Sequence, residues 1–177
     1  WVSNNGRDMM GDDIPSDEIN VIPAGAKNAP HYGYPFVHSA ADGSRISDPK
    51  FGDHSASQGL IFVDPAIRVQ AHAAVLGMSF YRGDSFPARF QNALFVAEHG
   101  SWNRSKKVGY QVSVATFDRN GQPDYQPFIT GWLQGEKAWG RPNDVFISPD
   151  GALLISDDKA GVVYRVTAIP TAQTPAS

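Results

Sequence analysis

Two segments of the chain gather basic and aromatic side chains that could bind a ligand. The first carries Trp102 and Arg104 in a loop directly after His99, and the second carries Trp139 and Arg141. The planar guanidinium fork of arginine matches a carboxylate, and an indole ring offers a flat apolar wall. We therefore interpret these five residues as candidate binding residues.

The same residue types also serve ordinary structural purposes. A surface arginine such as Arg141 pairs with a neighbouring acid, and a lone histidine such as His99 makes common hydrogen bonds. A loop tryptophan packs against its neighbours. Residue type alone does not separate binding from these structural roles, and both interpretations stay open at this point.

An internal near-repeat draws attention to the first of these segments. Residues 92–99 (NALFVAEH) and 151–158 (GALLISDD) each contain a small residue, an apolar run, another small residue and an acid. They read as one strand type used twice. The second copy soon reaches Gly161, whereas the first takes seven more residues to reach the matching Gly109. The extra loop, residues 100–107, is an insertion of the kind that repeat proteins place on a binding face.

The turn residues indicate an all-β fold. The chain has 17 Gly and 13 Pro and little sustained helical periodicity. The clearest hairpin joins residues 144–147 to 152–155 through a Ser-Pro-Asp-Gly turn, in which proline presets φ and glycine closes the turn. Residues 77–81 and 93–96 repeat this order with a longer connection. Each unit then supplies about four short strands over roughly 40 to 60 residues, which is typical of a propeller blade.

The chain therefore reads as two blades and most of a third within residues 1–169. Residues 28–69 are too irregular for strands to be placed. Residues 1–6 resemble the end of a strand without its preceding apolar residues, so the numbering is expected to open inside a strand, with further blades upstream. Residues 170–177 are rich in Pro, Thr and Ala and are predicted to form a disordered tail.

Composition narrows the classes of partner. A net charge of -3 gives no basic field for nucleic acid or anionic lipid. The absence of Cys excludes disulfides and thiolate metal sites, and the chain has no 18-residue apolar run that could span a membrane. His54 and His72 have no partner at a spacing that would indicate a catalytic triad.

A run of acids near the start of the chain invites a calcium interpretation. It consists of Asp8, Asp12, Asp13, Asp17 and Glu18. The spacing does not match the EF-hand loop, so a carboxylate cage for calcium is not supported. A solvated acidic loop is the simpler interpretation of these carboxylates.

Four sequence blocks together resemble the soluble quinoprotein glucose/sorbosone dehydrogenases, in their C-terminal portion. The blocks lie at residues 5–20, 31–35 (HYGYP), 99–104 (HGSWNR) and 139–145 (WGRPNDV). The likeness is greatest to the sorbosone dehydrogenase branch, because the glucose branch carries Lys in place of His99 and a second Arg in place of Asn143.

The resemblance implies a six-bladed β-propeller, of which this chain supplies roughly the last three blades, and a site for pyrroloquinoline quinone (PQQ) and calcium. It implies that His99, Trp102, Arg104, Trp139 and Arg141 contact PQQ. Calcium would be bound by the backbone carbonyls of Gly6 and Arg7, which leave little trace in side-chain identity.

The resemblance also implies a reaction, in which an aldose or a sorbosone-like aldehyde gives hydride to the quinone. Electrons then pass to an external acceptor, and the enzyme is expected to be periplasmic or secreted. In the family, the catalytic His and an Arg-Asn pair that grips the cofactor lie in earlier blades, and no segment of this chain matches them. These 177 residues alone are therefore not expected to turn over substrate.

Two other functions remain compatible with a propeller of this kind. One is a non-catalytic module that binds carbohydrate or protein on the same face. The other is a metal-dependent lactonase, which would need carboxylate and Asn ligands converging on the central axis. Fold alone does not choose between them and a dehydrogenase.

Overall fold

The computed structural model describes residues 1–28 and 30–169, and it has an all-β architecture, as predicted. Two short 3₁₀ helices, Ser55–Ser57 and Ala88–Phe90, accompany the strands. The strands are β1 Val2–Asn4, β2 Asp17–Asn20, β3 Val37–Ser39, β4 Arg45–Ser47, β5 Ile67–Val69, β6 Val75–Phe80, β7 Leu94–Glu98, β8 Gln111–Phe117, β9 Pro123–Ile129, β10 Leu133–Gln134, β11 Lys137–Ala138, β12 Pro142–Ile147, β13 Leu153–Asp157 and β14 Val162–Val166.

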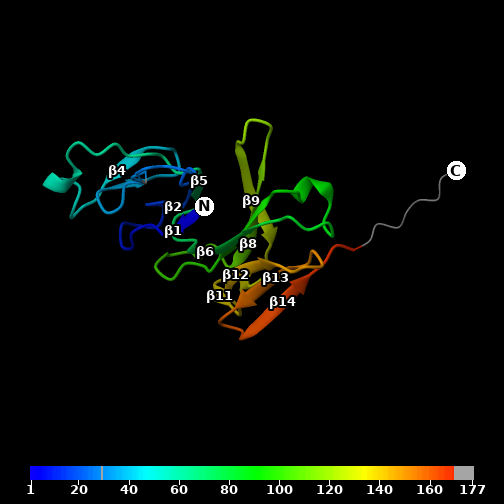
Figure 1. Cartoon of the computed structure of the whole chain (residues 1–177). Coiled ribbons are helices and arrows are strands. Elements are labelled where there is room, and N and C mark those ends of the chain that lie inside the picture. Colours follow the sequence, from blue (N-terminus) through cyan, green and yellow to red (C-terminus); the bar gives the residue numbers. More distant parts are fainter. Residues whose placement is uncertain (29, 170–177) are drawn as a thin grey trace.

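Three antiparallel sheets follow one another along the chain. The N-terminal sheet has the order β1-β2-β5, the central sheet β6-β7-β8-β9 and the C-terminal sheet β12-β13-β14. Figure 1 shows them in blue, green and orange, with the central sheet between the other two. Two further hairpins, β3-β4 and β10-β11, form separate two-stranded sheets. The segment in which strands could not be placed from sequence contains β3, β4 and β5.

Both hairpins predicted from the turn residues are present. In the C-terminal sheet Val145 lies opposite Ile155, and the Gly151 amide closes the turn by donating to the Ser148 carbonyl at 2.8 Å. Gly151 has a φ of 80°, which glycine adopts without strain. In the central sheet, Phe80 lies opposite Leu94 across the longer connection.

The near-repeat corresponds to a repeated strand. The two copies form β7 and β13, and each is the second strand of its sheet. The strands that follow, β8 and β14, pair with them in the same way. Near the N-terminus, residues 2–4 form β1, which lies antiparallel beside β2.

The alternation of side chains on β7 buries both faces of the central sheet. Phe95 and Ala97 belong to the core shared with the C-terminal sheet, whereas Leu94 and Val96 belong to the core shared with the N-terminal sheet. Successive residues of a strand point to opposite faces, so one strand supplies both cores. The central sheet thus stacks between its two neighbours.

The first strands of adjacent sheets approach closely. A Cβ atom on Gly77 of β6 would lie 1.8 Å from the Asp144 Oδ1 atom and 2.6 Å from the Asp144 Cα atom of β12. Glycine is therefore needed where these two strands meet. On its other side β6 contacts β1, where the Ser3 hydroxyl donates to the Leu76 carbonyl at 3.0 Å.

The predicted disordered tail, residues 170–177, lies outside the described residues. Within residues 1–28 and 30–169, no helix has the length and apolar character needed to cross a bilayer.

Candidate functional site

His99 and Arg141 meet at one edge of the central and C-terminal sheets. The Arg141 guanidinium donates through Nε to the His99 carbonyl at 2.9 Å and through Nη2 to the Gly100 carbonyl. Its central carbon lies 5.4 Å from the centre of the Tyr110 ring. The His99 Nε2 atom lies 2.9 Å from the Asp158 Oδ1 atom. The structure thus brings together two candidate residues that are 42 positions apart.

These contacts hold the Arg141 side chain in one orientation. Two of its nitrogens bond to carbonyls and the ring of Tyr110 supports its flat face. The Nη1 atom has no hydrogen-bond partner in the part of the chain that the structure describes. A guanidinium fixed in this way keeps the N–H groups of Nη1 for an anionic ligand.

Asp157 fixes the backbone from which Arg141 projects. Its carboxylate accepts from the Arg141 and Ala160 amides, both at 2.8 Å, and from the Tyr164 hydroxyl at 3.0 Å. Burial of the carboxyl acts to raise its pKa, but these hydrogen bonds prevail and the pKa of Asp157 lies below its ordinary value. The acid that ends the repeated strand therefore anchors the Arg141 turn.

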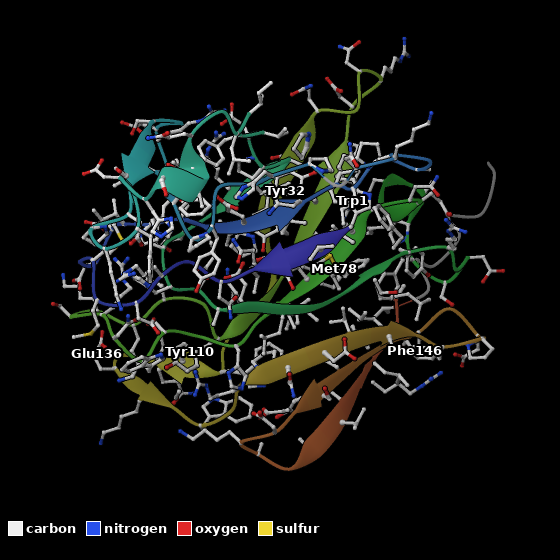
Figure 2. The ribbon with its side chains drawn as sticks, turned by 60° about the vertical axis from the view of Figure 1, so that its left-hand side comes forward. Trp1, Tyr32, Met78, Tyr110, Glu136 and Phe146 are labelled. Atoms are coloured by element: carbon white, nitrogen blue, oxygen red, sulfur yellow. The ribbon has the colours of Figure 1, made fainter. Side chains whose placement is uncertain are left out.

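The insertion at residues 100–107 is held from two sides. Arg104 is largely buried, and its guanidinium donates to the Asp12 carbonyl and forms an ion pair with Asp13 at 3.1 Å. The Ser105 amide donates to the Asp12 carboxylate at 3.1 Å. On the other side the Lys107 ammonium donates to the Glu136 carbonyl at 2.8 Å. Figure 2 shows Tyr110 and Glu136 toward the same end of the molecule.

These contacts give Arg104 and two of the acidic residues a structural role. The donors of Arg104 bond to the protein itself, so in this structure the side chain shapes the loop. Two members of the acidic run, Asp12 and Asp13, hold the insertion and are more than a solvated surface.

A cavity of about 100 Å³ opens beside the insertion, between the N-terminal and central sheets. Trp102, which is 69% exposed, forms part of its wall. The Oδ1 atom of Asn103 is buried and has no hydrogen-bond partner among the described residues. A buried, unpaired oxygen is costly unless a ligand, ion or water supplies a partner. The cavity is lined by Asn5, Gly6, Asp8, Asp17, His72, Ala74, Trp102 and Asn103.

His72 was not predicted to belong to this site. Its Nε2 atom lies 2.8 Å from the Gly11 carbonyl, and its backbone has a φ of 66° in the left-handed region. The residue lies in the connection between β5 and β6, which crosses from one sheet to the next. No motif in the sequence marks a histidine in that position.

Asp17 connects the cavity to the His99 backbone. One carboxylate oxygen accepts from the Gly6 amide at 2.8 Å and the other from the Ala74 amide at 2.6 Å. Burial raises the pKa of Asp17 to about 6, against the opposing effect of these hydrogen bonds. The Ala74 carbonyl in turn accepts from the His99 amide at 2.8 Å.

The two residues proposed to bind calcium through their carbonyls differ in their surroundings. Gly6 lines the cavity. The Arg7 side chain forms an ion pair with Asp48 at 2.9 Å, and Asp48 also contacts His38 at 2.8 Å. Burial acts to raise the pKa of Asp48, but these partners hold it well below its usual range. Within residues 1–28 and 30–169, no three His, Asp or Glu side chains converge as metal ligands.

Trp139 belongs to an aromatic cluster on the C-terminal sheet. Its ring stacks on Trp132 at a centroid distance of 6.3 Å, and its indole N–H donates to the Gly131 carbonyl at 2.7 Å. Trp139 is half exposed and does not line the cavity. His31, in the block at residues 31–35, accepts from the Gly33 amide and packs against Phe36 and Phe62.

This all-β chain, with candidate ligand-binding residues at one edge of stacked sheets, has recognisable relatives. The model of the TrAA12-like family matches residues 2–169, and the chain belongs to that family. The resemblance to quinoprotein dehydrogenases found in the sequence is confirmed at this level.

Two curated relatives illustrate how much of a longer protein the chain matches. An uncharacterized protein of Borreliella burgdorferi is 38% identical over 170 residues, which cover 94% of this chain and 42% of that protein. The pyrroloquinoline quinone-dependent pyranose dehydrogenase of Coprinopsis cinerea is 28% identical over 125 residues, 59% of this chain and 16% of that protein. The chain spans less than half the length of these relatives.

Solved structures share the fold. A calcium structure of a Trichoderma reesei carbohydrate-active enzyme of family AA12 superposes with a TM-score of 0.67 and 22% identity, over 92% of this chain and 45% of that one. The holo form of the PQQ domain of Coprinopsis cinerea pyranose dehydrogenase gives a TM-score of 0.62 and 21% identity, over 94% and 49% of the two chains.

Proposed function

We propose that this chain forms part of a PQQ- and calcium-dependent dehydrogenase that oxidises an aldose sugar or a sugar-derived, sorbosone-like aldehyde. Membership of the TrAA12-like family and the fold shared with a PQQ domain support the proposal. The observation that carries it is the meeting of His99 and Arg141, with one guanidinium nitrogen of Arg141 unpaired among the described residues.

The donor set suits a flat tricarboxylate next to a metal ion. Arg141 offers a fixed cationic donor, and the exposed face of Trp102 offers a flat apolar wall. The unpaired Asn103 oxygen and the Asp8 carboxylate give the cavity an excess of acceptors, as a hard cation requires. The residues therefore fit both groups.

Within the proposal each residue has a separate task. Bound PQQ supplies a two-electron acceptor for hydride. Arg141 binds a carboxylate of the cofactor, and His99, oriented by Asp158, contacts it from the neighbouring strand end. Trp102 and Trp139 serve as walls, Arg104 keeps the insertion in place, and the carbonyls of Gly6 and Arg7 bind calcium. Substrate would be a small sugar or aldehyde, and electrons would leave to an external acceptor.

The proposed fold is a six-bladed propeller of which these sheets are consecutive blades. Stacking of the central sheet between two others supports it, as does an uncovered apolar face on the C-terminal sheet, where Phe146 is 58% and Val163 is 64% exposed. Figure 2 shows Phe146 far from the Tyr110 end of the molecule. The same family resemblance supports a periplasmic or secreted location as part of the proposal.

The function is tested by titrating PQQ and calcium and following the quinone absorbance. This chain is expected to bind PQQ in a calcium-dependent manner, and a polypeptide of full family length that contains it is expected to show bleaching on addition of an aldose or aldehyde. Binding of sugar without any bleaching would support a non-catalytic module. Metal-dependent hydrolysis of lactones without quinone would support a lactonase, and either result would contradict the proposal.

A further inference from the structure

Asp17 uses its side chain in an unusual way. It is the first residue of β2, it is 1% exposed, and both carboxylate oxygens accept from backbone amides of other segments, those of Gly6 and Ala74. Within residues 1–28 and 30–169, no Lys or Arg forms a salt bridge with it. A buried carboxylate without a cation is costly to ionise, so the hydrogen bonds from these two amides must offset that cost.

The neighbouring acid on the same strand differs in its partners. Glu18 accepts from the hydroxyl of Ser39 at 2.6 Å and from the side-chain amides of Asn4 and Asn20, both at 3.2 Å. Those partners lie on the strands and hairpin around it, and they tie the N-terminal sheet together. Asp17 instead joins two loops that border the cavity.

A continuous path of hydrogen bonds passes through Asp17. The path runs from the Gly6 amide to Asp17, from Asp17 to the Ala74 amide, from the Ala74 carbonyl to the His99 amide, and from the His99 carbonyl to Arg141. It therefore links all three sheets. Ala74 has a φ of 57°, a left-handed conformation that costs free energy in a non-glycine residue and needs support from its surroundings.

We propose that Asp17 is a positioning residue that sets the Gly6–Arg7 loop relative to the His99–Arg141 pair. The inference rests on the proposed function, in which the loop carries calcium and the pair carries the anionic cofactor. A charged acceptor serves both amides at once, because two carboxylate oxygens accept two N–H groups, whereas an amide side chain offers only one oxygen.

The test compares Asp17→Asn with the matched control Asp118→Asn. Asp118 also accepts two backbone amides, those of Asn120 and Gln122, but it lies in the turn between β8 and β9 and does not line the cavity. The calcium concentration that half-saturates PQQ-induced quenching of tryptophan fluorescence is measured for each variant. We expect Asp17→Asn to raise it tenfold or more, with PQQ affinity at saturating calcium changed less than threefold and Asp118→Asn unchanged in calcium requirement. An unchanged calcium requirement in Asp17→Asn, or an equal loss of calcium and PQQ binding, would overturn the proposal.

Amide hydrogen exchange tests the link without any ligand. In the wild-type chain the Gly6 and Ala74 amides are expected to be as protected as the amides of β7, and Asp17→Asn is expected to lose protection at both. Fast exchange at both amides in the wild type would overturn the proposal even if Asp17→Asn fails to fold. If the wild type shows no calcium-dependent response to PQQ, the proposed function fails, and exchange still decides whether Asp17 holds the two loops.

Discussion

At the scale of single residues, the site depends on side chains that are held before any ligand arrives. Arg141 is fixed by two carbonyls and by the Tyr110 ring, and its own backbone amide is held by Asp157. Because little conformational freedom remains to be lost, binding of an anion at this arginine costs less entropy.

Replacement of Arg141 by Lys tests this arrangement. The ammonium of Lys cannot contact two carbonyls and a carboxylate with fork geometry, so we expect PQQ affinity to fall at least tenfold, about 1.4 kcal/mol. Arg165→Lys is the control, since Arg165 pairs with Asp150 on the surface of the same sheet. Isothermal titration of each variant with PQQ and calcium measures the difference, and equal affinities for Arg141→Lys and the wild type would remove Arg141 from the site.

The lowered pKa of Asp157 predicts an acid-dependent contribution to stability. A carboxyl whose folded pKa is below its unfolded value of about 3.9 stabilises the fold above that pH. That contribution is lost as the pH falls through the folded pKa. We expect Asp157→Asn to lower the free energy of unfolding by about 1–3 kcal/mol at pH 7, with a smaller difference from wild type below about pH 4. Urea unfolding across this pH range measures it, and a difference that does not depend on pH would contradict the assignment.

At the scale of elements, the two copies of the repeated strand differ through the loop that follows. Both strands end in a buried acid, Glu98 or Asp157, but only the first copy continues into the insertion. The insertion reaches Asp12 and Asp13 near the N-terminal sheet and Glu136 near the C-terminal sheet. It therefore bridges elements that the strands alone do not connect.

Arg104 is the main support of this bridge. Removing its guanidinium in Arg104→Met keeps the apolar stem but breaks the contacts with Asp12 and Asp13. We expect faster amide exchange and faster proteolysis within residues 100–107 of this variant. The control is Lys106→Ala, which replaces an exposed side chain of the same loop and is expected to leave both rates unchanged. Equal exchange and proteolysis rates in Arg104→Met and the wild type would show that the contacts of Arg104 do not order the insertion.

The features of the fold that follow from local sequence patterns could be predicted from the sequence. The Ser-Pro-Asp-Gly turn and the alternating apolar residues of β12 and β13 give the hairpin directly. The link from Asp17 to Ala74 could not be predicted, because it joins a side chain to a backbone amide 57 residues away whose conformation is unusual for alanine. The position of His72 at the cavity could not be predicted either, because it depends on the path of the chain between β5 and β6.

At the scale of the whole molecule, the C-terminal sheet has an apolar face that nothing in the described part of the chain covers. When the repeated segments 92–99 and 151–158 are aligned, Leu154 corresponds to Phe95. Phe95 lies in the core that the central sheet shares with the C-terminal sheet. The face that carries Leu154, Phe146 and Val163 is thus the one on which a further sheet would stack. Exposed apolar faces of this kind favour association.

The chain is therefore expected to self-associate in solution. The double variant Phe146→Ser with Val163→Thr should shift sedimentation velocity profiles toward the monomer and lower the binding of a hydrophobic dye. Ile61→Ser is the control, because Ile61 is an exposed apolar residue outside the sheets. A double variant that associates as strongly as the wild type would contradict the assignment of this face.

The proposed function requires one anionic, planar cofactor to bind at His99 and Arg141, beside the Gly6 loop. A crystal structure of the chain grown with PQQ and calcium tests it most directly. We expect electron density for PQQ with a carboxylate on the Arg141 guanidinium and for a calcium ion on the Gly6 and Arg7 carbonyls. Density for PQQ at another surface, with these residues unchanged and free of ligand, would contradict it.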